Sequence, residues 1–285
     1  MAGTGLAISQ GGRETRLKWH RLRRSAGDPE FSADVMAEGF RLGASMELDL
    51  RVRADGGFSV LHDADLTRET TGIGQVLLQT KADLAPLRYR QSGQPLILSE
   101  GLADLMPLAH PDALLQFDMK DDLATIGLRG LDHLVDLFGG STAPIIFSGG
   151  CPFLMQSIAE RLPRLRVGID PTDRLLDIVQ AQDFAAAGAA LTAELRGGFV
   201  PDTCYLSWEL LLWAQQSGLD LVALCHAEAV KVDAWTYNLA APARGFSPPE
   251  TVQFSALMAL QPDQITTDEA VAIQMAWLNA AGAAT

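Results

Sequence analysis

The chain has 285 residues, more than most single domains, although α/β barrels of about 250 residues fold as one domain. Its hydrophobic content of 48% and charged content of 20% are typical of a globular protein with a large core. The formal net charge of −13 argues against a nucleic-acid partner. A phosphate-containing substrate would therefore need locally positive groups, supplied by a metal ion or by a few Arg and Lys side chains.

The cysteines and the amino terminus favour a cytoplasmic protein. Cys151, Cys204 and Cys225 are widely spaced, odd in number and in no C-x-x-C pattern, as expected of free thiols in a reducing compartment. The first 20 residues lack a basic start followed by an apolar segment, and no apolar run approaches 18 residues. We therefore expect neither a signal peptide nor membrane insertion. The oligomeric state is left open, and a homo-oligomer is compatible with the sequence.

The first third of the chain predicts a short lead-in followed by the start of the main domain. Residues 1–15 are expected to be loose, and residues 16–285 to form one domain. We expect a strand over 17–20, a helix over 32–43 that Ser32 caps, a strand over 45–51 and a hairpin strand over 58–62. The irregular, turn-rich residues 66–95 predict an insertion, extending to about residue 112, with one short helix near 81–87.

The remaining two thirds alternate between helical and strand patterns. Helices are expected over 99–109, 123–138, 152–161, 173–186, 208–229 with a break at Gly218, 250–260 and 268–281. Strands are expected over 113–119, 144–148, 165–169, 189–193, 203–207, 230–237 and 264–267, with a loop over 240–249. About eight βα units predict an α/β fold of the (β/α)8 TIM-barrel class, with a small insertion after the second strand. A doubly wound sheet is disfavoured because no glycine-rich phosphate loop follows any strand.

Residues 45–65 carry the clearest functional signal. In Met46-Glu47-Leu48-Asp49-Leu50 the two carboxylates lie on one side of a strand, roughly 6.6–7 Å apart at Cα. Two carboxylates on one face of an apolar strand repel each other, and a hard divalent cation between them relieves that repulsion. A turn at Asp55-Gly56-Gly57 and a second strand then lead to His62-Asp63. The alternative is a surface hairpin with Glu47 and Asp49 in water.

Other polar residues follow separate predicted strands. In a barrel the active site lies at the carboxyl ends of the strands. The residues placed there are His20-Arg21, Asp118, Lys120, Asn238 and Asp268. We therefore expect these residues to form one site.

These motifs resemble the glycerophosphodiester phosphodiesterase family, part of the superfamily of phospholipase C-like phosphodiesterases. The resemblance covers roughly residues 16–280 and rests on six motifs in the order that the family has them. They are His20-Arg21, Glu47-Leu48-Asp49, Asp55-Gly56 with His62-Asp63, Asp118-Met119-Lys120, Trp235-Thr236-Tyr237-Asn238 and Thr267-Asp268.

The resemblance implies a hydrolase of lipid metabolism that cleaves a small glycerophosphodiester. It implies a (β/α)8 barrel and a divalent cation, Mg²⁺ or Ca²⁺, bound by carboxylates matching Glu47, Asp49 and Asp118. By the same resemblance His20 and His62 are the catalytic acid and base, in an order the sequence does not assign. Arg21 and Lys120 are expected to bind the phosphate oxygens. By its family position Trp235 stacks on the substrate or packs in the core, and Asn238 orients a ligand or caps a turn.

The chain departs from the family pattern in three places. Leu22 stands where the family usually has Gly, Phe31 replaces the Asn of a P-E-N-T loop, and Asp118 replaces the usual Glu. Asp and Glu both suit a hard cation, so the change at Asp118 should leave catalysis intact. The changes at Leu22 and Phe31 lie where the substrate would be bound, so they bear on the identity of the substrate. Three alternatives stay open: a hydrolase of opine-like sugar phosphodiesters, a lipid hydrolase like sphingomyelinase D, and a catalytically silent binding protein.

Overall fold

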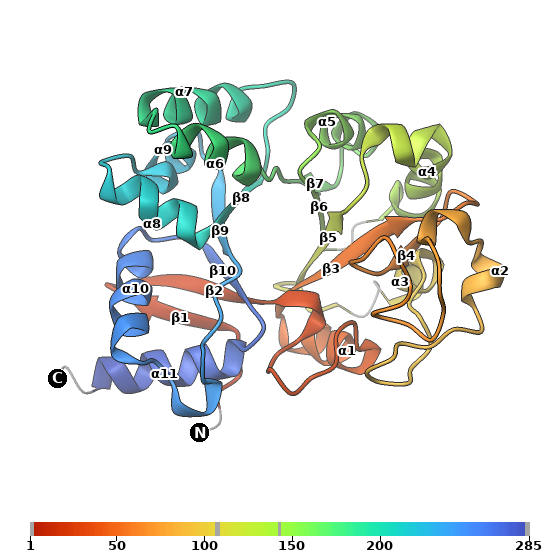
Figure 1. Cartoon of the computed structure of the whole chain (residues 1–285), viewed down its shortest axis with the longest axis horizontal. Helices are drawn as coiled ribbons and strands as arrows, with labels where there is room; N and C mark the ends of the chain where they lie inside the picture. Colours follow the sequence, from red (N-terminus) through yellow and green to blue (C-terminus); the bar gives the residue numbers. More distant parts are fainter. Residues whose placement is uncertain (1–2, 106–108, 142–143, 283–285) are drawn as a thin grey trace. The chain divides into compact units, whose positions relative to one another are not determined.

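Strand and helix alternate along the chain in the computed structural model, which describes residues 3–105, 109–141 and 144–282 (Figure 1). The residues group into two units. We call Met1–His20, Arg24–Ala26 and Gly168–Thr285 the terminal unit, and Arg21–Arg23 and Gly27–Val167 the central unit.

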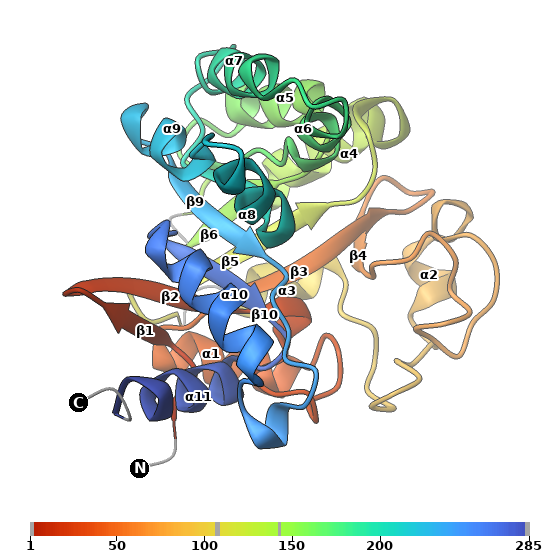
Figure 2. The ribbon, with the colours of Figure 1, turned by 60° about the vertical axis from the view of Figure 1, so that its left-hand side comes forward.

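The central unit is built on four mutually parallel strands in the order β7-β6-β5-β3, with β4 antiparallel to β3. Its strands are β3 (Ser45–Val52), β4 (Phe58–Val60), β5 (Leu114–Met119), β6 (Ile145–Ser148) and β7 (Arg166–Val167). Its helices are α1 (Ala33–Leu42), α2 (Lys81–Leu84), α3 (Ser99–Leu105), α4 (Leu123–Phe138) and α5 (Pro152–Arg161), with a 3-10 turn η2 (Val76–Leu78). In Figure 2 the segment that carries α2 extends away from β5 and β6, as expected of an insertion.

The terminal unit contains four further parallel strands in the order β2-β10-β9-β8, with β1 antiparallel to β2. Its strands are β1 (Ala7–Gln10), β2 (Arg13–Trp19), β8 (Thr203–Ser207), β9 (Lys231–Trp235) and β10 (Gln264–Thr267). Its helices are α6 (Thr172–Gln180), α7 (Phe184–Leu195), α8 (Trp208–Gln216), α9 (Leu221–Ala227), α10 (Pro248–Ala259) and α11 (Ala270–Gly282), with a 3-10 turn η4 (Pro242–Arg244). A further 3-10 turn, η1 (His20–Leu22), follows β2.

Along the described part of the chain, each of the eight parallel strands is followed by at least one helix. This is the α/β repeat of the (β/α)8 TIM barrel, and the predicted fold class is confirmed.

The strand that carries the acidic pair is buried on both faces. Leu48 on one face and Asp49 on the other have no exposed surface, and Glu47 is only 3% exposed. The alternative of a surface hairpin is therefore wrong. The parallel register places Glu47 opposite Gln116 and Asp49 opposite Asp118, which brings the carboxylates of β3 and β5 together.

Local signals set the limits of several elements as predicted. Ser32 accepts a hydrogen bond from the Val35 N–H at the start of α1, and Gly43 ends that helix with a φ of 77°. Gly218, with a φ of 83°, separates α8 from α9 in the region predicted to break there.

Three expectations need correction or completion. Residues 189–193 lie inside α7, whose sequence is rich in alanine, so helix propensity prevails over the apolar run that suggested a strand. The predicted loose lead-in contains β1, which pairs with β2. Part of the helix expected over 99–109 and of the insertion expected over about 66–112 lies outside the described residues. Among those described, no helix combines the length and the apolarity needed to span a membrane.

Candidate functional site

Three carboxylates converge in the central unit, two from the middle of β3 and one from the carboxyl end of β5. Glu47, Asp49 and Asp118 each offer an oxygen, and these atoms all lie within 4.8 Å of one another. We call these residues the acidic triad. They are the three predicted metal ligands, and the β3–β5 register is the reason that they meet.

Two cationic side chains border the acidic triad. Lys120 Nζ lies 2.8 Å from Asp49 Oδ1 and also contacts Asp118 Oδ2. Arg21 Nε lies 3.3 Å from Asp49 Oδ2, and the Arg21 backbone N–H donates to Glu47 Oε2 at 2.7 Å. The predicted phosphate-binding residues therefore lie directly beside the predicted metal ligands.

These contacts shift the protonation of the buried carboxylates in opposite directions. Burial raises the pKa of Asp49, but the charges of Lys120 and Arg21 outweigh burial, so its pKa lies below the ordinary value. Burial and the neighbouring charge of Asp49 hold the pKa of Glu47 well above its ordinary value. For Lys120, the surrounding carboxylates outweigh burial and raise the pKa. Three ionised carboxylates would outnumber the two cations, which is why the pKa of Glu47 is raised.

The residues present fit a divalent cation. Neither oxygen of the fully buried Asp49 accepts a well-formed hydrogen bond from the described residues, despite the close Lys120 ammonium. Three carboxylates form the all-oxygen ligand set that Mg²⁺ and Ca²⁺ prefer. A cation held by Glu47, Asp49 and Asp118 would satisfy these oxygens and relieve the repulsion on Glu47.

Asp118 has a buried support that the sequence analysis missed. Ser148 Oγ donates to Asp118 Oδ1 at 3.1 Å, and Gln116 Nε2 donates to Ser148 Oγ at 2.8 Å. Both residues are buried at the strands of the central unit. Polar residues in apolar strands are the signal that could have identified them, because they must find hydrogen-bond partners.

His62 is held by a network of charged residues. Its Nδ1 lies 2.8 Å from Asp63 Oδ1, and Arg68 donates to both oxygens of Asp63. The Arg68 contacts, more than the opposing effect of burial, hold the pKa of Asp63 well below its ordinary value. The carboxylate of Glu69 accepts the backbone N–H groups of His62 and Asp63, at 3.1 and 2.7 Å. Arg68 and Glu69 were not among the predicted site residues.

His20 belongs to the terminal unit and has a similar carboxylate partner. Its Nδ1 lies 2.7 Å from Asp268 Oδ1. Asn238 Nδ2 donates to Asp268 Oδ2 at 2.7 Å, and the Asp268 N–H donates to Asn238 Oδ1 at 2.9 Å. Asn238 therefore positions the partner of His20.

Trp235 ends β9 in the terminal unit and is half-buried. Its indole Nε1 is buried and has no hydrogen-bond partner among the described residues. An indole N–H is a donor that normally finds an acceptor when it is buried.

The two family departures near the site occupy unusual backbone positions. Leu22 has a φ of 60° and Phe31 a φ of 57°, in the left-handed region that Gly and Asn favour. The Phe31 N–H donates to the carbonyl of Arg21 at 2.9 Å, which joins the two loops. The backbone conformation is therefore one that suits the residues of the family pattern, while both replacement side chains are buried.

The predicted site residues thus divide between the two units. The central unit brings together Arg21, Glu47, Asp49, Asp118 and Lys120, and the charge of His62 contributes to the lowered pKa of Asp49. The terminal unit holds His20, Trp235 and Asn238. His20 and Arg21 are neighbours in the chain.

No family model matches the sequence, and no curated protein matches it. Solved structures do. A protein of Silicibacter pomeroyi DSS-3 shares 17% identity over 94% of each chain, with a TM-score of 0.69. A glycerophosphodiester phosphodiesterase of Parabacteroides distasonis shares 18% identity over 94% of this chain and 98% of that one, with a TM-score of 0.65.

A third similar structure contains a bound product. It is a phosphodiesterase of Oleispira antarctica in complex with the product sn-glycerol-3-phosphate, with 17% identity over 91% of this chain and 95% of that one and a TM-score of 0.64. At these identities the likeness concerns the fold. The chain therefore shares, over more than nine tenths of its length, the fold of solved phosphodiesterases, glycerophosphodiester phosphodiesterases among them.

Proposed function

We propose that this chain is a divalent-cation-dependent phosphodiesterase that hydrolyses a small glycerophosphodiester to an alcohol and a phosphomonoester. The observation that carries the proposal is the acidic triad with Lys120 and Arg21 against it, where β3 runs beside the carboxyl end of β5. In barrels of this class the active site lies at that end of the strands. The shared fold with solved glycerophosphodiester phosphodiesterases supports the same activity.

A phosphodiester resists hydrolysis because its anionic oxygens repel nucleophiles and its leaving alkoxide is a poor leaving group. Arg21 and Lys120 carry the positive charges that would bind the non-bridging oxygens, the first as a planar fork and the second as a point charge. A Mg²⁺ or Ca²⁺ ion on Glu47, Asp49 and Asp118 would supply further charge neutralisation at phosphorus.

The two histidines supply the proton transfers. In each, a carboxylate lies at Nδ1, Asp63 for His62 and Asp268 for His20, which orients the ring and leaves Nε2 for proton transfer. One imidazole accepts the proton of the nucleophile, a water molecule or a substrate hydroxyl. The other donates a proton to the leaving oxygen as its bond to phosphorus breaks. Trp235 would stack on the substrate, and Asn238 acts through Asp268.

The proposal is tested by following release of sn-glycerol-3-phosphate from glycerophosphoethanolamine and glycerophosphocholine, with Mg²⁺, Ca²⁺ or EDTA. We expect turnover with a divalent cation and its loss in EDTA. The product is the one bound in the Oleispira antarctica structure. Absence of turnover with every cation would contradict the proposal.

The variant His62→Ala separates an enzyme from a silent binding protein. We expect kcat to fall by at least ~100-fold, because a proton-transfer group is lost. His110→Ala is the matched control, since His110 lies in a loop and contacts Asp112. If both variants retain the wild-type rate, His/His catalysis is wrong.

A further inference from the structure

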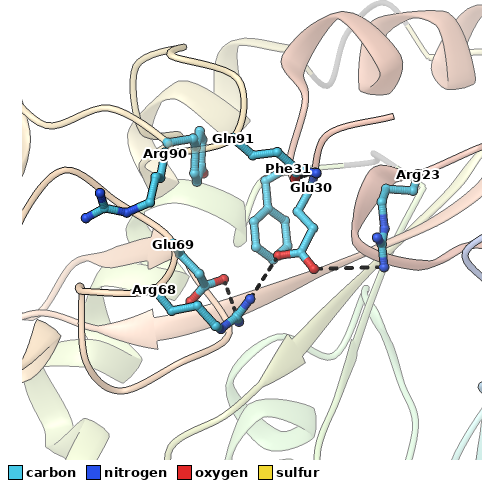
Figure 3. Close-up of a pocket in the computed structure, with 8 residues that line it drawn as sticks. Arg23, Glu30, Phe31, Arg68, Glu69, Arg90 and Gln91 are labelled. Carbon is cyan, nitrogen blue, oxygen red and sulfur yellow. Dashed lines mark hydrogen bonds and ion pairs between the residues drawn. The ribbon is translucent and has the colours of Figure 1, made fainter. Parts of the chain in front are cut away.

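The loops of the central unit enclose a second feature beside the acidic triad, a pocket of about 390 Å³ (Figure 3). We call it the arginine pocket. The residues that line it are Arg23, Glu30, Phe31, Arg68, Glu69, Tyr89, Arg90 and Gln91. They come from two segments outside the parallel strands, the loop before α1 and the insertion between β4 and α3.

The charge of this lining is positive, in a chain whose formal net charge is −13. Three guanidinium groups face two carboxylates. In Figure 3 the carboxylate of Glu30 lies between Arg68 and Arg23, at 3.5 and 3.8 Å. Arg21 also donates to Glu30, at 3.0 Å, so one carboxylate is shared by three arginines.

The other carboxylate is fully engaged. Both oxygens of the buried Glu69 accept N–H groups, from His62 and Asp63, and Oε1 also lies 3.5 Å from Arg68 Nη2 (Figure 3). The third arginine of the lining, Arg90, is exposed, and its side chain points away from Phe31 (Figure 3). It donates to the carbonyl of Thr70 at 2.7 Å. Its guanidinium forms no ion pair with any of the described residues. The lining therefore favours an incoming anion over a cation.

Two chains of contacts join the arginine pocket to the proposed reaction centre. Arg21 spans the gap on one side, with Nη1 at 3.0 Å from Glu30 and Nε at 3.3 Å from Asp49. Arg68 spans it on the other, because the Asp63 that it binds contacts Nδ1 of His62. The arginine pocket therefore lies within two side chains of both the acidic triad and His62, close enough for a substituent of a phosphodiester bound there.

Buried aromatic rings and backbone hydrogen bonds hold part of the pocket lining in place. The rings of Phe31 and Tyr89 lie 5.9 Å apart, and both side chains are buried. The Tyr89 hydroxyl donates to the Val60 carbonyl at 2.9 Å, and the Glu30 N–H donates to Gln91 Oε1 at 3.1 Å. The volume is that of a small-molecule site.

We propose that the arginine pocket binds an anionic group, a carboxylate or a phosphate, on a substituent of the phosphodiester, so that the enzyme prefers substrates with this extra negative charge. This inference rests on the proposed function and names the class of substrate. Arg23 and Arg90 are the specificity-determining residues. Arg68 is not used in the test because it also binds Asp63, so that its replacement would disturb His62 as well.

The test compares substrates that differ by one anionic group. Glycerophosphoserine and glycerophosphoethanolamine differ by a carboxylate; glycerophosphoglycerol and its terminally phosphorylated form differ by a phosphate. In at least one pair we expect kcat/KM to be about tenfold higher for the more anionic substrate, as for a charge-assisted hydrogen bond. The pair that shows the preference identifies the group. A ratio near one in both pairs would overturn the inference.

Arg90→Gln and Arg23→Gln are expected to reduce that ratio about fivefold or more. Arg88→Gln is the matched control, because Arg88 is exposed on the same segment, donates to backbone carbonyls and does not line the pocket. It should leave the ratio unchanged. A preference that persists in both Arg90→Gln and Arg23→Gln would also overturn the inference.

Failure of the proposed function is recognised separately, by the absence of turnover of every diester. In that case calorimetry with O-phosphoserine and phosphoethanolamine, both in Mg²⁺, tests the pocket alone. Tighter binding of O-phosphoserine that is lost in Arg90→Gln would support the anion site. Equal binding of the two compounds would overturn it.

Discussion

The ammonium of Lys120 lies 2.8 Å from Oδ1 of Asp49, a carboxylate with no exposed surface. Burial alone would favour the neutral acid, yet the charges of Lys120 and Arg21 keep the pKa of Asp49 below its ordinary value. The cations proposed to bind phosphate therefore also keep this proposed metal ligand ionised.

Divalent cations should stabilise the protein through the acidic triad. At a cation concentration 100-fold above Kd, binding adds about 2.7 kcal/mol to the free energy of unfolding. We expect the thermal midpoint in Mg²⁺ or Ca²⁺ to exceed that in EDTA, and Asp49→Asn to remove most of the difference. Asp112→Asn, at an exposed residue, serves as control. An equal shift in Asp49→Asn would show that the ion binds elsewhere.

Asp63 should act on catalysis by orienting His62. Asp63→Asn keeps the size of the side chain but removes the charge beside Nδ1, and we expect kcat to fall about 10–100-fold with little change in KM. Asp65→Asn is the control two residues away, where the carboxylate of a half-buried residue accepts the Thr67 N–H. The fall in kcat should occur without a loss of thermal stability. If kcat is unchanged, the His62–Asp63 contact has no catalytic role.

The ion pair of Glu100 with the buried Arg53 should make stability depend on pH. Although burial opposes it, the Arg53 guanidinium lowers the pKa of Glu100 to about 2 in the folded protein, from an ordinary 4.5. A lowered folded pKa means that this stabilisation is complete above pH 4.5 and is lost as the pH falls from 4.5 towards 2.

Glu100→Gln should therefore lower the free energy of unfolding by about 1–3 kcal/mol at pH 7, measured in urea. The difference from the wild type should shrink below pH 4.5. Glu160→Gln, on the exposed face of α5, should show little effect at either pH. A difference that stays constant between pH 7 and pH 3 would contradict the assignment.

The backbone conformation at Leu22 should make a glycine variant more stable than an alanine variant, the reverse of the usual order. At a φ of 60° a Cβ costs roughly 1–2 kcal/mol, so Leu22→Gly should be more stable than Leu22→Ala by about 1 kcal/mol. Both should be less stable than the wild type, because the leucine side chain is buried. At Leu48 in β3 the order should be the normal one, with alanine more stable by about 0.5–1 kcal/mol. Urea unfolding of the four variants decides the matter.

The sequence determined the features that depend on short-range patterns. The period of two in residues 46–50 predicted that Glu47 and Asp49 share a face, and the Ser32 and Gly43 signals predicted the limits of α1. The succession of βα patterns predicted the (β/α)8 class, although the alanine-rich α7 was mistaken in part for a strand. Each of these features follows from interactions between residues that are close in the chain.

The family resemblance grouped Glu47, Asp49 and Asp118, but only the tertiary structure decided how they meet and which other residues join them. The β3–β5 register set Asp118 against Asp49, and the insertion brought Glu69 under the backbone of His62. The arginine pocket joins residues 23–31 to residues 68–91, and its charge is opposite to that of the whole protein. No local pattern predicts such contacts, because they depend on the packing of distant segments, and that packing is fixed by burial of the core rather than by the sequence around each site.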